Sequence, residues 1–198
     1  FVEATAVASF ILIALYKDRH GLEGAFKYLI LSAIATVLML FSIALLLLVA
    51  GDTSFVAVYG AMGEGAHTFL TKLAMALFIC GLCIKSGVVP FHAWLPDAYS
   101  AAPAPVSVLL AGIVTKVSGV YALIRIMISV FGLSPMAKNV LLFLGTASII
   151  WGALQALTQN NFKRMLSYSS ISQVGYIIVG LGCATPLALA GAAFHLFN

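Results

Sequence analysis

Residues 81–105, GLCIKSGVVPFHAWLPDAYSAAPAP, decide the fold of this chain, because an apolar run carries a lysine and then meets several prolines. The lysine is Lys85, and the first proline, Pro90, follows five residues later. A lysine at the centre of a bilayer costs about 2.5 to 3.5 kcal/mol on insertion scales, so membrane helices hold one where it has a partner or a function. A proline cannot continue the hydrogen bonding of a helix. The sequence therefore predicts a broken membrane helix near Lys85 to Pro90.

The composition of the whole chain indicates a membrane protein. Of the 198 residues, 63% are hydrophobic and 8% are charged, and the mean hydropathy is +1.12. Soluble proteins carry about 25% charged residues. The chain begins and ends within apolar runs, so we expect residues 1–198 to be one transmembrane domain, an internal fragment of a longer chain. The basic residues form no stripe, and nucleic acid is not an expected partner.

Apolar runs divided by polar clusters predict the helices. A membrane span needs about 20 mostly apolar residues. Seven runs meet this pattern, the first and last truncated, so the expected fold is an all-α polytopic membrane helix bundle. The glycine-rich stretch 51–67 is expected to be a polar loop. The expected helices cover 1–16, 25–50, 69–90, 106–131, 136–157, 164–181 and a stretch from about 186.

The basic residues are unequally divided between the two ends of the expected bundle. Cytoplasmic loops of membrane proteins are enriched in lysine and arginine. The sequence therefore predicts that the loops Lys17 to Lys27 and Lys163 to Arg164 are cytoplasmic. One end holds Lys17, Arg19, Lys27, Lys163 and Arg164, and the other holds Lys72, Arg125 and Lys138.

Three ionisable residues are expected at membrane depth. Lys116 follows Val106 by ten residues, which places it about 15 Å into its helix. Glu3 precedes Lys17 by 14 residues, about 21 Å from the end of its helix. Burial disfavours the charged form of a lysine such as Lys85, and a nearby carboxylate favours it again. Such groups can take up and release protons, so the sequence favours ion or proton transport.

Each of these residues also has a structural interpretation. Glu3 could lie near a membrane interface, because its helix is truncated. Lys85 could extend its side chain to the cytoplasmic interface. Lys116 could form a static ion pair that fixes helix packing. Other polar residues could serve hydrogen bonding between helices, loop fixing or orientation alone, namely His92, Asp97, Lys163 and His195.

Two segments resemble a known family. KSGVVPFHAWLPDAYSAAPAPVSVLLAGIVTKVSGVYALIR at 85–125 and NNFKRMLSYSSISQVGYIIVGLG at 160–182 look like its members. The family is that of the antiporter-like subunits shared by respiratory complex I, Mrp-type sodium/proton antiporters and membrane-bound nickel–iron hydrogenases. The opening VEATAVASFILIALY, at 2–16, is most similar to the hydrogenase-4-type member.

The resemblance implies roles for individual residues. Glu3 falls on a glutamate that pairs with the lysine of the broken helix, here Lys85. Lys116 falls on a second lysine position, and His195 falls on a histidine in an F-H-L pattern. These four would translocate protons, with supporting roles for His92, Asp97 and Lys163.

The expected function is proton translocation by a non-catalytic subunit of a redox-driven complex, either NADH-quinone oxidoreductase-like or a hydrogenase. The resemblance implies partner membrane subunits in a prokaryotic inner membrane. The cysteines Cys80, Cys83 and Cys183 supply no ligand set, so we expect no redox cofactor and no metal in this chain.

Two alternatives remain. Sodium/proton antiport would need oxygen ligands, which Glu3, Ser86, Thr115 and Ser118 offer. A structural membrane anchor for partner subunits would use the same charges as packing pairs.

Overall fold

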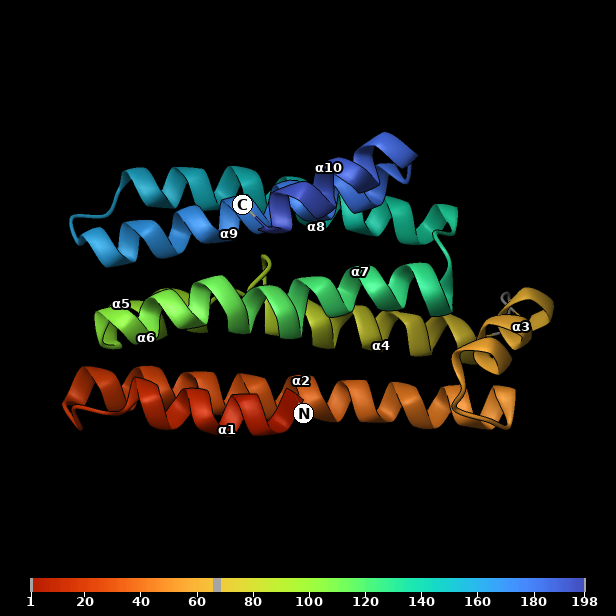
Figure 1. The fold of residues 1–198 in the computed structure, drawn as a ribbon, viewed down its shortest axis with the longest axis horizontal. Coiled ribbons are helices and arrows are strands. Elements are labelled where there is room, and N and C mark those ends of the chain that lie inside the picture. Colours follow the sequence, from red (N-terminus) through yellow and green to blue (C-terminus); the bar gives the residue numbers. More distant parts are fainter. Residues whose placement is uncertain (1, 66–68, 198) are drawn as a thin grey trace.

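The computed structural model describes residues 2–65 and 69–197, which form helices joined by short connections in three layers (Figure 1). The outer layers hold α1 and α2 on one side and α8, α9 and α10 on the other, with α4 to α7 between them. The described residues contain no strand, so the all-α prediction is confirmed. The helices are α1 (Val2–Ile13), α2 (Arg19–Ala50), α3 (Phe55–Gly65), α4 (Phe69–Ser86), α5 (Trp94–Ala101), α6 (Ala104–Leu109), η1 (Leu110–Tyr121), α7 (Ala122–Ile126), η2 (Met127–Phe131), α8 (Pro135–Leu157), α9 (Phe162–Cys183) and α10 (Pro186–Phe197).

Four stretches of the described chain are long and apolar enough to cross a membrane. The third of them joins α6, η1, α7 and η2 into one continuous helix. α1 and α10 have only 12 residues each. The expected count of seven spans is therefore not established by length and composition. The four spans are Arg19–Ala50, Phe69–Ser86, Ala104–Phe131 and Pro135–Leu157.

The predicted helix break is confirmed, but it comes earlier than expected. α4 ends at Ser86, not near Pro90, because Gly87 takes the left-handed conformation with φ of 68°. The N–H of Gly87 donates to Ile84 O at 3.2 Å, and the N–H of Val88 donates to Cys83 O at 3.0 Å. This pair of bonds is the common way in which a glycine ends a helix. The chain then resumes as α5, so that α4 and α5 together follow one line through the middle layer (Figure 1).

The proline-rich connection contains the short helix α5 instead of an irregular loop. Pro96 is the third residue of α5, and a proline in the first turn removes no helical hydrogen bond. Pro103 precedes α6 and Pro105 lies in its first turn, so these two prolines begin the next helix. The prolines therefore mark where the helices of this segment begin, and they do not prevent the helices from forming.

The expectation of a polar loop over 51–67 was wrong for its central part, which is α3. Asp52 accepts a hydrogen bond from the Ser54 hydroxyl at 2.9 Å, and Ser54 Oγ accepts from the N–H of Ala57 at 3.4 Å, so the helix start is capped. Hydrogen bonds from Ser54 and then Thr53 hold the pKa of Asp52 below its ordinary value. Val58 is 5% exposed and packs with apolar residues of α2, which offsets the poor helix propensity of the glycines.

Candidate functional site

Lys85 lies in the last turn of α4, at the helix break. Its side chain is 4% exposed. The amine donates to Ser32 Oγ of α2 at 2.6 Å and lies 3.3 Å from Glu3 Oε1 of α1. A cation is also favoured at the C-terminal end of a helix, where carbonyl oxygens lack partners. Because the side chain is buried, the interpretation that Lys85 extends to the interface was wrong.

Other groups hold this arrangement in place. Glu3 also accepts a hydrogen bond from the Thr36 hydroxyl of α2, although its side chain is 54% exposed. The indole N–H of Trp94, the first residue of α5, donates to Ile84 O at 2.9 Å. That carbonyl belongs to the residue just before Lys85, so the two halves of the broken helix are bonded beside the charge.

Lys116 has a different environment. It lies in η1, a stretch of π-helix, in which the Thr115 hydroxyl donates to Leu110 O at 3.0 Å. π-Helical turns are rare and occur often at functional sites. Lys116 is half-buried and makes no hydrogen bond or ion pair with any residue that the structure describes. The static ion pair considered for Lys116 is therefore absent among the side chains that the structure describes, at 2–61 and 69–197.

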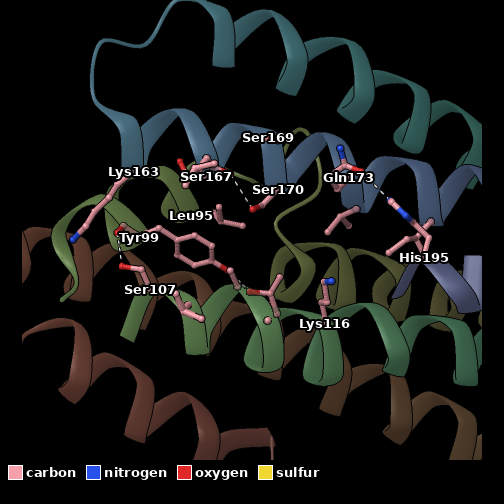
Figure 2. A pocket seen from close by; sticks show the side chains of 17 residues that line it. Leu95, Tyr99, Ser107, Lys116, Lys163, Ser167, Ser169, Ser170, Gln173 and His195 are labelled. Atoms are coloured by element: carbon pink, nitrogen blue, oxygen red, sulfur yellow. Dashed lines mark hydrogen bonds between the residues drawn. The ribbon is translucent and has the colours of Figure 1, made fainter. Parts of the chain in front are cut away.

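The lysine lines a cavity of about 560 Å³ between η1 and α9. Figure 2 shows Lys163 at one end of this cavity, Lys116 on its η1 side, and Gln173 with His195 at the other end. The described lining contains no carboxylate but many hydroxyls. Its polar members besides the lysines and His195 are Tyr99, Ser107, Thr115, Ser167, Ser169, Ser170 and Gln173.

The two ends of the cavity are fixed by hydrogen bonds. Lys163 Nζ donates to Ala102 O at 2.8 Å, at the C-terminal end of α5. His195 Nε2 and Gln173 Oε1 share a hydrogen bond of 2.9 Å. Gln173 and the hydroxyl lining were not predicted, although the run SYSSISQ in α9 indicates a polar helix face.

The structure thus separates the predicted residues into two groups. Glu3 and Lys85 form one, and Lys116, Lys163 and His195 share the cavity. No hydrogen bond or ion pair joins these two groups in the described chain. η1 packs tightly between them, because a Cβ on Gly119 would lie 2.8 Å from Ser86 Cα.

His92 and Asp97 belong to neither group. His92 Nε2 accepts a hydrogen bond from the Trp151 indole at 3.1 Å. Asp97 is 2.7 Å from Lys27 Nζ and 3.1 Å from Arg164 Nη1, so it ties α5 to α2 and α9. The structure therefore gives Asp97 the loop-fixing contacts that its position suggested. Among the described residues, no three His, Cys, Asp or Glu side chains are grouped closely enough to hold a metal ion.

Long apolar helices, a broken span and charged side chains held inside the bundle define the class of this protein, a polytopic integral membrane protein. More specifically, the chain belongs to the family described as "NADH:quinone oxidoreductase/Mrp antiporter, TM", which it matches over residues 1–198. The family resemblance expected from the sequence is confirmed. The finer likeness to the hydrogenase-4-type member stays a prediction.

Individual relatives agree with this assignment. The chain is 34% identical over 197 residues to an Na(+)/H(+) antiporter subunit of Alkalihalophilus pseudofirmus, covering 99% of this chain and 40% of that protein. It is 36% identical over 201 residues to an NADH-quinone oxidoreductase subunit of Ectopseudomonas mendocina, covering 98% and 40%. The chain thus spans about 40% of the length of these relatives.

Solved structures show the same fold. A chain of the membrane-bound sulfane sulfur reductase, an archaeal respiratory membrane complex, superposes with a TM-score of 0.92 at 32% identity, covering 100% of this chain and 40% of that one. A chain of the Mrp complex from Dietzia sp. DQ12-45-1b gives 0.90 at 27% identity, covering 99% and 37%.

Proposed function

We propose that this chain is part of a proton-translocating membrane subunit, in which Glu3, Lys85, Lys116 and His195 exchange protons. The observation that carries the proposal is Lys116. Within the described chain this lysine has no ion-pair partner, and it faces a cavity lined by hydroxyls. A cavity of about 560 Å³ has room for several waters, which can connect Lys116 to Lys163 and His195.

The Glu3–Lys85 pair controls when a proton leaves Lys85. While the carboxylate lies 3.3 Å from the amine, Lys85 keeps its proton. When the pair opens, the buried amine loses its counter-charge, which favours release of its proton. The half-exposed carboxylate of Glu3 is the partner that can move, because Lys85 is held inside the bundle.

The arrangement of the helices supports the proposed orientation. The α1–α2 and α8–α9 turns lie at the same end of the bundle (Figure 1), so the loops Lys17 to Lys27 and Lys163 to Arg164 face one side. We assign this side to the cytoplasm of a prokaryote. All seven expected helices would cross the membrane.

The relatives supply the proposed setting. Two of them are named as subunits, one of an Na(+)/H(+) antiporter and one of an NADH-quinone oxidoreductase. We infer that this chain works beside other membrane subunits in a redox-driven complex and binds no redox cofactor itself. The complex would be of the NADH-quinone oxidoreductase or hydrogenase kind.

Sodium/proton antiport is the second candidate, favoured by the name of one relative. Sodium requires oxygen ligands, and the cavity offers hydroxyls such as that of Thr115 but no carboxylate among its described lining, because Glu3 belongs to the other group. A structural anchor is the third candidate. It requires Lys116 to be a packing residue, for which the described chain offers no partner.

Proton flux driven by a pH jump tests the proposal in vesicles that hold the full-length subunit in its complex. We expect Lys116→Met to lower sodium-independent flux by about 100-fold, the effect of removing one proton-transfer group. Lys72→Met is the matched control, because Lys72 is an exposed lysine at the start of α4. Unchanged flux in Lys116→Met with an intact complex would favour the anchor, and flux that requires sodium would favour antiport.

A further inference from the structure

The connection between α4 and α5 is bound to α8 by two hydrogen bonds. The N–H of Val89 donates to Ser148 Oγ at 3.0 Å. The indole N–H of Trp151 donates to His92 Nε2 at 3.1 Å. Ser148 and Trp151 are three residues apart, so they lie on the same face of α8. α8 thus holds the connection at its middle and near its end.

The bond from Trp151 fixes the protonation state of His92. An indole N–H can only donate, so Nε2 must be the unprotonated nitrogen of the imidazole and Nδ1 must carry the hydrogen. Nδ1 is buried. Burial lowers the pKa of His92 below its ordinary value, and an interaction with the Pro90 backbone raises it again in part. A proton added to Nε2 would turn the acceptor into a donor facing another donor. Protonation of His92 and the Trp151 bond therefore exclude each other.

No described charge competes for the imidazole. The rings of Trp151 on α8 and Tyr168 on α9 lie 6.3 and 6.4 Å from the His92 ring, and Tyr168 is the titratable group among them. On α5, Asp97 is paired with Lys27 and Arg164. On α4, Lys85 is bonded to Ser32 and Glu3. Among these groups, Trp151 is therefore the one whose contact with His92 changes when His92 is protonated.

The connection is in turn bonded to the helix end that carries Lys85. Trp94, two residues after His92, donates to Ile84 O at 2.9 Å. Gly87 packs so closely against Leu95 that a Cβ added to Gly87 would lie 2.4 Å from Leu95 Cδ1. A displacement of the connection away from α8 must therefore disturb the last turn of α4.

We propose that Ser148 and Trp151 are positioning residues that hold the α4–α5 connection, and that a proton bound by His92 releases the His92 end of this connection from α8 while the Val89–Ser148 bond remains. The released connection changes the position of Lys85 relative to Glu3. The release itself needs only the His92–Trp151 geometry, whereas its effect on ion flux rests on the proposed function.

Hydrogen exchange of residues 87–93 in the full-length complex, corrected for the intrinsic rate at each pH, tests the release. In the wild type we expect exchange to increase as the pH falls, because protonated His92 cannot accept from Trp151. In Trp151→Phe, which keeps a ring but lacks the donor, exchange should be fast at every pH. His92→Gln offers an amide oxygen that accepts without titrating, so exchange should stay slow at every pH.

Leu154→Ala is the control, because Leu154 is exposed on the same helix and should leave the pH dependence unchanged. Exchange that does not depend on pH in the wild type, or a pH dependence that survives in His92→Gln, would overturn the proposal. Exchange is measured without ion flux. Loss of the proposed translocation function would therefore leave this result standing, and failure of the release would leave the Lys116 test valid.

Discussion

Lys85 and Lys116 are the same residue type inside the same bundle, but they have opposite surroundings. Lys85 is 4% exposed and bonded to a serine and a glutamate from two other helices. Lys116 faces a cavity and makes no hydrogen bond or ion pair within the described residues. The Lys85 amine is thus fixed by partners from two other helices, whereas the Lys116 amine is fixed by none within the described residues.

Neutralising the carboxylate beside Lys85 should have the largest effect on stability. Glu3→Gln leaves the buried amine without its counter-charge, and we expect a loss of about 2–3 kcal/mol, reduced because Glu3 is half-exposed. Chemical denaturation of the full-length subunit in detergent measures it. Lys85→Met added to Glu3→Gln should restore most of the loss, since no unpaired charge then remains.

Lys116→Met is the matched comparison for this measurement. It removes a charge without leaving a described partner unpaired, so stability should be unchanged or higher. A loss for Lys116→Met as large as that for Glu3→Gln would mean that the two lysines do not differ as their surroundings indicate.

The burial of the lysines and the helix break could be predicted from the sequence, but the groups that surround each lysine could not. Pro90 indicated a break, but the helix is ended by the left-handed Gly87 and by the backbone hydrogen bonds that Gly87 and Val88 donate. The Glu3–Lys85 pair was implied by the family resemblance, because residues 82 positions apart cannot be paired from local pattern. The cavity was not predicted, since it arises where α5, η1, α9 and α10 meet.

Local periodicity also failed at two elements. α3 was missed because its glycines suggested a loop, while the packing of Val58 against α2 depends on tertiary structure. The π-helical η1 was missed because an apolar run has no signal that separates π from α hydrogen bonding. The roles of Glu3, Lys85, Lys116 and His195 in translocation stay predictions.

Two glycines of η1 lie in different surroundings: Gly119 packs against the end of α4, and Gly112 lines the cavity. Substitution of Gly119 should have the next largest effect on stability. A Cβ on Gly119 would lie 2.7 Å from Ser86 Oγ and 2.8 Å from Ser86 N, so Gly119→Ala should push η1 away from the end of α4. Overpacking costs about 1–3 kcal/mol, and the better helix propensity of alanine returns part of it, leaving about 1–2 kcal/mol. The same denaturation experiment measures the loss.

Gly112→Ala is the control on the cavity side. Apart from its own helix, no described residue has an atom within 4 Å of a Cβ at Gly112, so this variant should be neutral or slightly more stable. Equal losses in the two alanine variants would show that η1 does not pack more tightly on the side of Lys85.

The smallest effect is expected at Asp97, where the ion pairs are partly open to solvent. The Asp97 side chain is 24% exposed, and its partners Lys27 and Arg164 are each 41% exposed. Partly exposed ion pairs contribute about 0–1 kcal/mol, so Asp97→Asn should cost less than about 1 kcal/mol, and raised salt should reduce the difference. Denaturation of both proteins at low and high ionic strength measures this.

The Asp97 pairs and the Glu3–Lys85 pair should differ in how strongly the cost of substitution depends on ionic strength. Most of the cost of Glu3→Gln comes from leaving the buried Lys85 amine unpaired, which added salt does not relieve, although Glu3 itself is 54% exposed. The cost of Glu3→Gln should therefore depend on ionic strength less than the cost of Asp97→Asn. If Asp97→Asn instead costs more than Glu3→Gln and resists salt, the charges at the end of the bundle hold the break in place. The contrast between Lys85 and Lys116 would then have to be explained by the contacts of α5 rather than by the local partners of each lysine.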